Sequence, residues 1–138
     1  MQNETVKVIH LDNNEAAFSI AFVPWSARNG ELTLVVGTAA DTQLTPRTCT
    51  SGFLRTYLLK EDGTDLELLH KVSIGSGFRI GNSDTPMQTE TDDVPLSLLA
   101  FQGKLITGVG KALRLYEIGK KKLLRKSENR VSCLLVDI

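Results

Sequence analysis

The sequence predicts an all-β protein whose strands form repeated antiparallel units of four. Most of the chain consists of short apolar segments, rich in Leu and β-branched residues and bounded by Gly, Pro, Asn or Asp, and few stretches show a helical period. A pair of segments recurs. "FLRTYLL" (53–59) aligns with "ALRLYEI" (112–118), and "LELLHK" (66–71) follows the first as "KKLLRK" (121–126) follows the second. Such repetition predicts a repeat architecture.

The first complete unit is predicted at residues 14–73. Its strands are expected at Ala17–Val23, Leu32–Thr38, Gly52–Leu59 and Asp65–Ser73, and "EDG" (61–63) has the composition of the turn between the last two. Residues 1–13 precede this unit, and Thr5–His10 is predicted to be the outer strand of an earlier one.

The second unit is predicted at residues 94–127, after a polar, Gly-rich surface insertion at 74–93 that contains few large apolar residues. Its strands are expected at Pro95–Phe101, Lys104–Val109, Ala112–Ile118 and Lys122–Ser127, with "FQGK" (101–104) as the first turn. Residues 128–138 would begin a third unit with a strand at Val131–Val136.

The spacing of the repeat identifies the kind of unit. If the 74–93 insertion is set aside, the two copies are separated by roughly 40 residues, close to the length of a four-stranded propeller blade. We therefore predict an incomplete β-propeller of the WD40-like type, with about two antiparallel four-stranded blades and flanking strands, since closed rings need about four to eight blades. A two-sheet sandwich made from the same ten strands is the alternative.

Composition limits the class of protein. The hydrophobic fraction of 41% and the charged fraction of 23% are ordinary for a globular domain. No apolar run is long enough for a transmembrane helix and the N-terminus lacks a signal-peptide pattern, so we expect no membrane association. Cys49 and Cys133 have no metal-ligand spacing, which favours a reducing compartment without a zinc site.

Motifs for catalysis are missing, so we expect a protein that is not an enzyme and has no cofactor, metal or small-molecule substrate. "GVGK" (108–111) lacks the earlier Gly and the following Ser or Thr of a phosphate-binding loop, and is predicted to be a tight turn. His70 is predicted to be a structural strand residue and Trp25 a packed anchor in a loop, since neither has a catalytic or ligand partner nearby in sequence.

The most basic stretch lies at the end of the second unit. Nine basic residues and two acidic ones fall between positions 104 and 130 of a chain whose formal net charge is zero. Two interpretations are open: lysines that discourage edge-to-edge pairing of an outer strand, which we favour, or contacts to RNA phosphates. The candidate contact residues for a partner or RNA are Lys120, Lys121, Lys122, Arg125, Lys126 and Arg130.

Four segments carry a resemblance to a known family: "NEAAFS" (14–19), "GFLRTYLL" (52–59), "LHK" (69–71) and "FQGKLITGVGKALRLYEIGKKKLLRKSENR" (101–130). They resemble the family of the large propeller subunit of splicing factor 3b, whose relatives include the large subunits of the cleavage and polyadenylation specificity factor and of the DNA-damage-binding protein. The match covers nearly the whole chain except 74–93, and 108–126 is most similar to the splicing member.

The resemblance implies a fragment from the C-terminal third of a chain with three propellers. It implies a nuclear, non-enzymatic protein–protein scaffold for pre-mRNA splicing in the U2 small nuclear ribonucleoprotein, in contact with other splicing factor 3b subunits and with at most indirect or weak RNA contact. The alternative is a nucleic-acid-binding module of a related cleavage/polyadenylation or DNA-damage-binding propeller, acting through the basic 104–130 segment.

Overall fold

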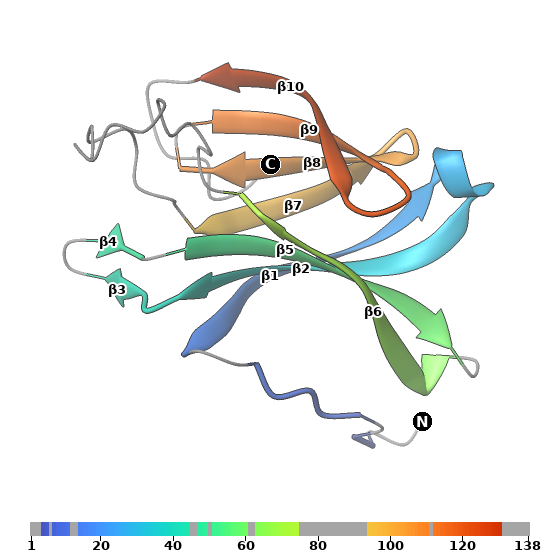
Figure 1. Cartoon of the computed structure of the whole chain (residues 1–138), viewed down its shortest axis with the longest axis horizontal. Coiled ribbons are helices and arrows are strands. Elements are labelled where there is room, and N and C mark those ends of the chain that lie inside the picture. Colours follow the sequence, from blue (N-terminus) through green and yellow to red (C-terminus); the bar gives the residue numbers. More distant parts are fainter. Residues whose placement is uncertain are drawn as a thin grey trace.

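The fold is seen in a computed structural model of the chain, which describes residues 4–5, 7–11, 14–44, 47–49, 51–60, 63–74, 94–110 and 112–130. These residues form two separate four-stranded antiparallel sheets and a small hairpin (Figure 1). The only helix among them is the single turn η1 (Ser26–Arg28).

The first sheet contains four strands in the spatial order β1-β2-β5-β6. Their bounds are β1 (Glu15–Trp25), β2 (Glu31–Ala40), β5 (Ser51–Lys60) and β6 (Asp65–Ser73). A two-stranded sheet, β3 (Gln43–Leu44) with β4 (Arg47–Thr48), extends the link between β2 and β5. Asn29 and Gly30 both have a positive φ in the turn that follows η1, which lets the chain reverse from β1 into β2.

The second sheet has the spatial order β10-β9-β8-β7, so its strands are also neighbours in sequence. The bounds are β7 (Pro95–Phe101), β8 (Lys104–Val109), β9 (Ala112–Ile118) and β10 (Leu123–Arg130). Gly110 has a positive φ in the tight turn between β8 and β9, so the turn predicted at "GVGK" lies at its second glycine, while Gly108 and Val109 end β8.

Each sheet is a meander, and this is the form of a propeller blade. No strand of either four-stranded sheet is exchanged with the other, as the crossing connections of a Greek-key sandwich would require. The first strands, β1 and β7, make the closest contact between the sheets (Figure 1). The prediction of an all-β, incomplete propeller with two antiparallel four-stranded blades is confirmed.

The main core lies between the two blades. Its buried residues come from both sheets: Val23, Trp25, Val35, Leu54, Ile74, Leu105, Val109, Tyr116, Ile118 and Leu123. Trp25 is fully buried and its indole Nε1 donates a hydrogen bond to Thr33 Oγ1 at 2.6 Å. The prediction of a packed anchor is therefore confirmed, although Trp25 ends strand β1 and does not lie in a loop.

Close backbone approach holds the blades together at one point. The Ser19 hydroxyl on β1 donates a hydrogen bond to the Pro95 carbonyl oxygen at the start of β7. Gly37 on β2 lies beside this contact, and a Cβ atom there would be 2.8 Å from the same carbonyl oxygen. Only glycine leaves room for this approach, so Gly37 allows β2 of the first blade to pack closely against the start of β7 in the second.

Three expectations about local structure are wrong. Thr5 and residues 7–10 are not in a strand, because the segment has no ladder partner and contacts the first sheet through the Lys7–Asp65 ion pair. Ile74, assigned to the insertion, is buried in the core. Lys122 does not begin the last strand, which starts at Leu123 and continues to Arg130. The rest of the insertion, 75–93, and the expected strand Val131–Val136 lie outside the described residues.

Candidate interaction site

The aligned arginines of the repeat are buried cations. Arg55 on β5 makes two hydrogen bonds to the carboxylate of Glu15 on β1, from Nε at 2.8 Å and from Nη2 at 2.7 Å. The hydroxyl of Thr38 also donates to Glu15, and the Lys71 ammonium lies 3.2 Å away. The carboxylate is thus shielded by three donors from three other strands of the same sheet.

This network shifts the pKa values of Glu15 and Arg55 in opposite directions. The Arg55 hydrogen bond, opposed by burial and helped by Thr38 and Lys71, lowers the pKa of Glu15 from 4.5 to about 2. The Glu15 hydrogen bond likewise raises the pKa of Arg55 above its usual value. Both groups therefore stay ionised at neutral pH. The ion pair has a structural role, because it joins β1 to β5 within the first sheet.

The second blade repeats the buried arginine with a different acid. Arg114 Nε donates to Glu128 on the neighbouring strand β10 at 2.7 Å, and Nη1 donates to the Ile74 carbonyl oxygen at 2.5 Å. Because Ile74 follows the last strand of the first blade, Arg114 ties the two blades together. Sequence alignment found both arginines, but it could not identify their acids, which lie on different strands in the two repeats.

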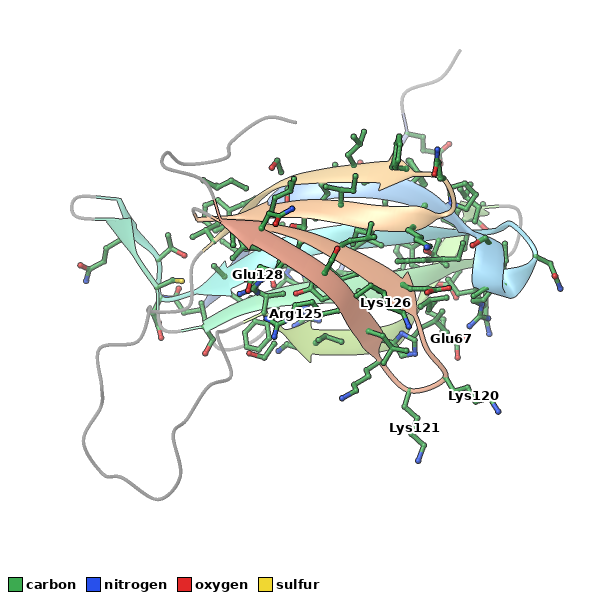
Figure 2. All side chains as sticks on the ribbon, turned by 90° about the horizontal axis from the view of Figure 1, so that it is seen from above. Glu67, Lys120, Lys121, Arg125, Lys126 and Glu128 are labelled. Atoms are coloured by element: carbon green, nitrogen blue, oxygen red, sulfur yellow. The ribbon has the colours of Figure 1, made fainter. Side chains whose placement is uncertain are left out.

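The basic candidates form a projecting hairpin. Lys120, Lys121 and Lys122 make up the turn between β9 and β10, and all three side chains are exposed. Figure 2 shows Lys120 and Lys121 at the tip, pointing away from both sheets. Arg125 and Lys126 follow on β10, whereas the side chain of Arg130 lies outside what the structure describes.

Only some of the basic side chains in this hairpin have an ion-pair partner. Lys126 Nζ lies 3.8 Å from the carboxylate of Glu117 on β9. Among the side chains that the structure describes, Lys120, Lys121, Lys122 and Arg125 have no ion-pair partner, and outside this group only Lys104 also lacks one. Positive charge without a counter-ion is therefore concentrated in the turn and the first residues of β10.

The turn is held in place from two sides. Its own backbone closes through a hydrogen bond from Gly119 N to the Lys122 carbonyl oxygen at 2.8 Å. His70 on β6 of the other blade places its Nε2 3.3 Å from the Lys120 carbonyl oxygen. His70 is buried, as predicted for a structural strand residue, but sequence spacing gave no signal that it would contact the basic turn.

The favoured interpretation of the lysines needs correction. β10 is the edge strand of its sheet, as expected, but the three lysines precede it and cannot shield its unpaired backbone groups. A bulge between Arg125 and Ser127 interrupts the ladder of this strand. Bulges and strand charges are themselves sufficient to discourage edge pairing. Arg125 and Lys126 lie on this edge strand, whereas the three lysines lie in the turn before it.

Two kinds of feature are absent from the described part of the chain. There, no three His, Cys, Asp or Glu side chains gather in a way that could hold a metal ion. None of its helices has the length and apolar character to cross a bilayer. The described residues present a basic turn and the outer faces of two sheets as possible interaction surfaces.

Two meander blades joined through their first strands, with a buried arginine in each, define a segment of a β-propeller protein. The family model described as the CPSF A subunit region matches residues 1–138, and the chain belongs to this family. It is 50% identical over 94% of its length to the pre-mRNA-splicing factor RSE1 of Mycosarcoma maydis.

Animal and plant proteins are similar as well. Identity is 39% over 94% of the chain with splicing factor 3B subunit 3 of Danio rerio, and 39% over 92% with spliceosome-associated protein 130 A of Arabidopsis thaliana. The chain spans about 9% of the length of these relatives. The similarity to splicing proteins predicted from four segments is confirmed.

Proposed function

We propose that the chain is a non-enzymatic protein–protein scaffold, a two-blade part of a splicing factor 3b subunit that acts in the nucleus within the U2 small nuclear ribonucleoprotein. The relatives support the splicing role through their names, and the blade fold supports the scaffold role because it presents extended sheet faces and turns to other proteins. The partners would be other splicing factor 3b subunits.

The observation that carries the scaffold role is the apolar character of both outer sheet faces. On β1, Ile20 is 63% exposed and Phe22 is 56% exposed, alternating with side chains that face the core. On the second sheet, Leu99 and Phe101 are exposed on the face away from the first. Apolar rows on two opposite faces are typical of surfaces that pack against further protein.

The flanking segments fit this role. We propose that residues 1–13 end a preceding blade, that the chain beyond Arg130 leads into a following blade, and that 75–93 is a surface insertion between the two blades. Neighbouring blades would then cover the apolar faces, and the turns at the ends of the strands would stay open to partners.

A second candidate function is nucleic-acid binding through the basic 104–130 segment. The cations of the β9–β10 turn favour it because they lack counter-ions in the described structure. Two observations weigh against it: residues 117–130 contain no aromatic residue, and Tyr116 is buried, so the turn offers no base-stacking platform.

RNA titration separates the two candidates. We expect the chain to bind single-stranded RNA only non-specifically, with a Kd of roughly 10⁻⁴ to 10⁻⁶ M that weakens as salt is added, because phosphate contacts alone are available. Fluorescence anisotropy at several salt concentrations would measure this. Tighter binding at physiological salt that survives competition by unrelated RNA would contradict the scaffold assignment.

A further inference from the structure

Two contacts hold the backbone of the β9–β10 turn. Gly119 N donates a hydrogen bond to the Lys122 carbonyl oxygen, and His70 Nε2 lies 3.3 Å from the Lys120 carbonyl oxygen. Binding to such a turn costs little backbone entropy, since the conformation is already set before a ligand arrives. Three adjacent ammonium groups are thereby presented at one end of the blade pair (Figure 2).

The turn lysines have no acidic partner within their own hairpin. The hairpin (112–130) contains two acids, and both are already paired, Glu117 with Lys126 and Glu128 with Arg114. Acids therefore have to come from another molecule if the turn is to be neutralised. Edge protection does not explain the lysines either, because they lie outside strand β10.

The location of the turn keeps it accessible in a larger ring. Sheet faces are covered when blades stack, but strand-connecting turns stay at the two ends of a propeller. The β9–β10 turn and the β7–β8 turn (Gln102–Gly103) lie at the same end of the second blade (Figure 1). A partner could thus reach the turn lysines without displacing any blade.

The chemistry around the turn suits a peptide better than a nucleic acid. Leu124 is exposed and lies beside Gly119, so an apolar side chain can be buried next to the lysines. Carboxylates bind well to lysine ammonium groups, which act as point charges on flexible stems. RNA binding without sequence preference normally adds stacking on aromatic side chains, and residues 117–130 have none.

We propose that Lys120, Lys121 and Lys122, together with Leu124 at the start of β10, form a docking site for an acidic segment of a partner protein, with Asp or Glu residues around an apolar one. The inference rests on the proposed scaffold function, for which it specifies the chemistry of one partner. The acidic carboxylates pair with the ammonium groups of the turn, and the apolar residue of the segment covers Leu124.

The test compares two ligands and two matched variants of the 138-residue chain. The ligands are a labelled Glu-rich peptide with a central Leu and a labelled oligouridine of the same charge. The turn variant carries Lys120→Ser, Lys121→Ser and Lys122→Ser. The control variant carries Lys7→Ser, Lys60→Ser and Lys104→Ser, which changes the net charge equally. Fluorescence anisotropy measures binding, and thermal unfolding verifies that both variants are folded.

We expect the chain to prefer the peptide, and the turn variant to bind it about tenfold more weakly, as the loss of several exposed ion pairs predicts. The control variant should lose less than about threefold, because Lys7 and Lys60 lie outside the second blade and Lys104 lies on β8 and not in the turn. Equal losses in both variants would overturn the docking site, as would no peptide binding at all. Neither result touches the scaffold assignment, whereas a preference for oligouridine that depends on the turn would overturn both.

Discussion

Replacing Glu15 by Gln should lower the free energy of unfolding by about 3–5 kcal/mol, the usual cost of leaving one partner of a buried ion pair uncompensated. The side chain of Glu15 is 1% exposed and that of Arg55 is 9% exposed. Water therefore cannot solvate the Arg55 guanidinium once the Glu15 carboxylate is removed. Urea denaturation followed by circular dichroism would measure the change.

The matched control is the exposed ion pair between Arg28 in η1 and Glu31 at the start of β2. There the side chains are 33% and 42% exposed, and Glu31→Gln should cost no more than about 1 kcal/mol. A loss in Glu15→Gln no larger than that in Glu31→Gln would show that the buried network does not stabilise the blade.

The same carboxylate should make stability depend on pH. Its pKa is lowered from 4.5 to about 2 in the folded chain, so its contribution is fully present above pH 4.5 and is lost as the pH falls toward 2. The contribution corresponds to about 3 kcal/mol. Over this pH range the Glu15→Gln variant should show a smaller fall in unfolding free energy than the unaltered chain; parallel curves would contradict the assignment.

Trp25→Ala should have an effect of similar size, about 3–5 kcal/mol, because it removes the largest side chain of the core between the blades. The cavity would lie where both sheets meet, so we expect loss of cooperative unfolding of the two blades as well as loss of stability. Thermal unfolding monitored by circular dichroism measures both.

Trp25→Phe is the control for this prediction. It keeps most of the apolar volume and removes only the hydrogen bond to Thr33, whose hydroxyl still donates to the Val23 carbonyl oxygen at 3.3 Å. The cost should be about 1–2 kcal/mol. If Ala and Phe destabilise equally, packing at this position is not what holds the blades together.

The architecture was predictable because the repeat consists of features that can be read from short stretches of sequence. Strand-forming segments, turn residues and the paired Arg55 and Arg114 recur in the same order, and each sheet uses strands that are neighbours in sequence. The failure at Thr5–His10 has a physical cause: strand propensity has no effect without a neighbour to complete the ladder. Ile74 was missed because one buried residue beside a polar stretch leaves no periodic pattern.

For the candidate site, the sequence predicted which residues are basic but not where they lie in the fold. The sequence shows that Lys120, Lys121 and Lys122 are adjacent, but whether they lie on the strand or in the turn depends on where the ladder with β9 begins. The acid partner of Arg55 lies 40 positions away, and the contact of His70 with the turn links the two blades. Such long-range pairings follow from tertiary packing, which local spacing does not encode.

The central claim, that these blades hold splicing-factor subunits together, can be tested in the RSE1 protein of Mycosarcoma maydis, which is 50% identical to the chain where they align. The aligned segment would be replaced either by a flexible linker or by this chain, and each tagged protein purified after ribonuclease treatment. We predict that the linker version loses splicing factor 3b subunits and that the graft restores them. A linker version that retains every subunit, or a folded graft that restores none, would contradict the account.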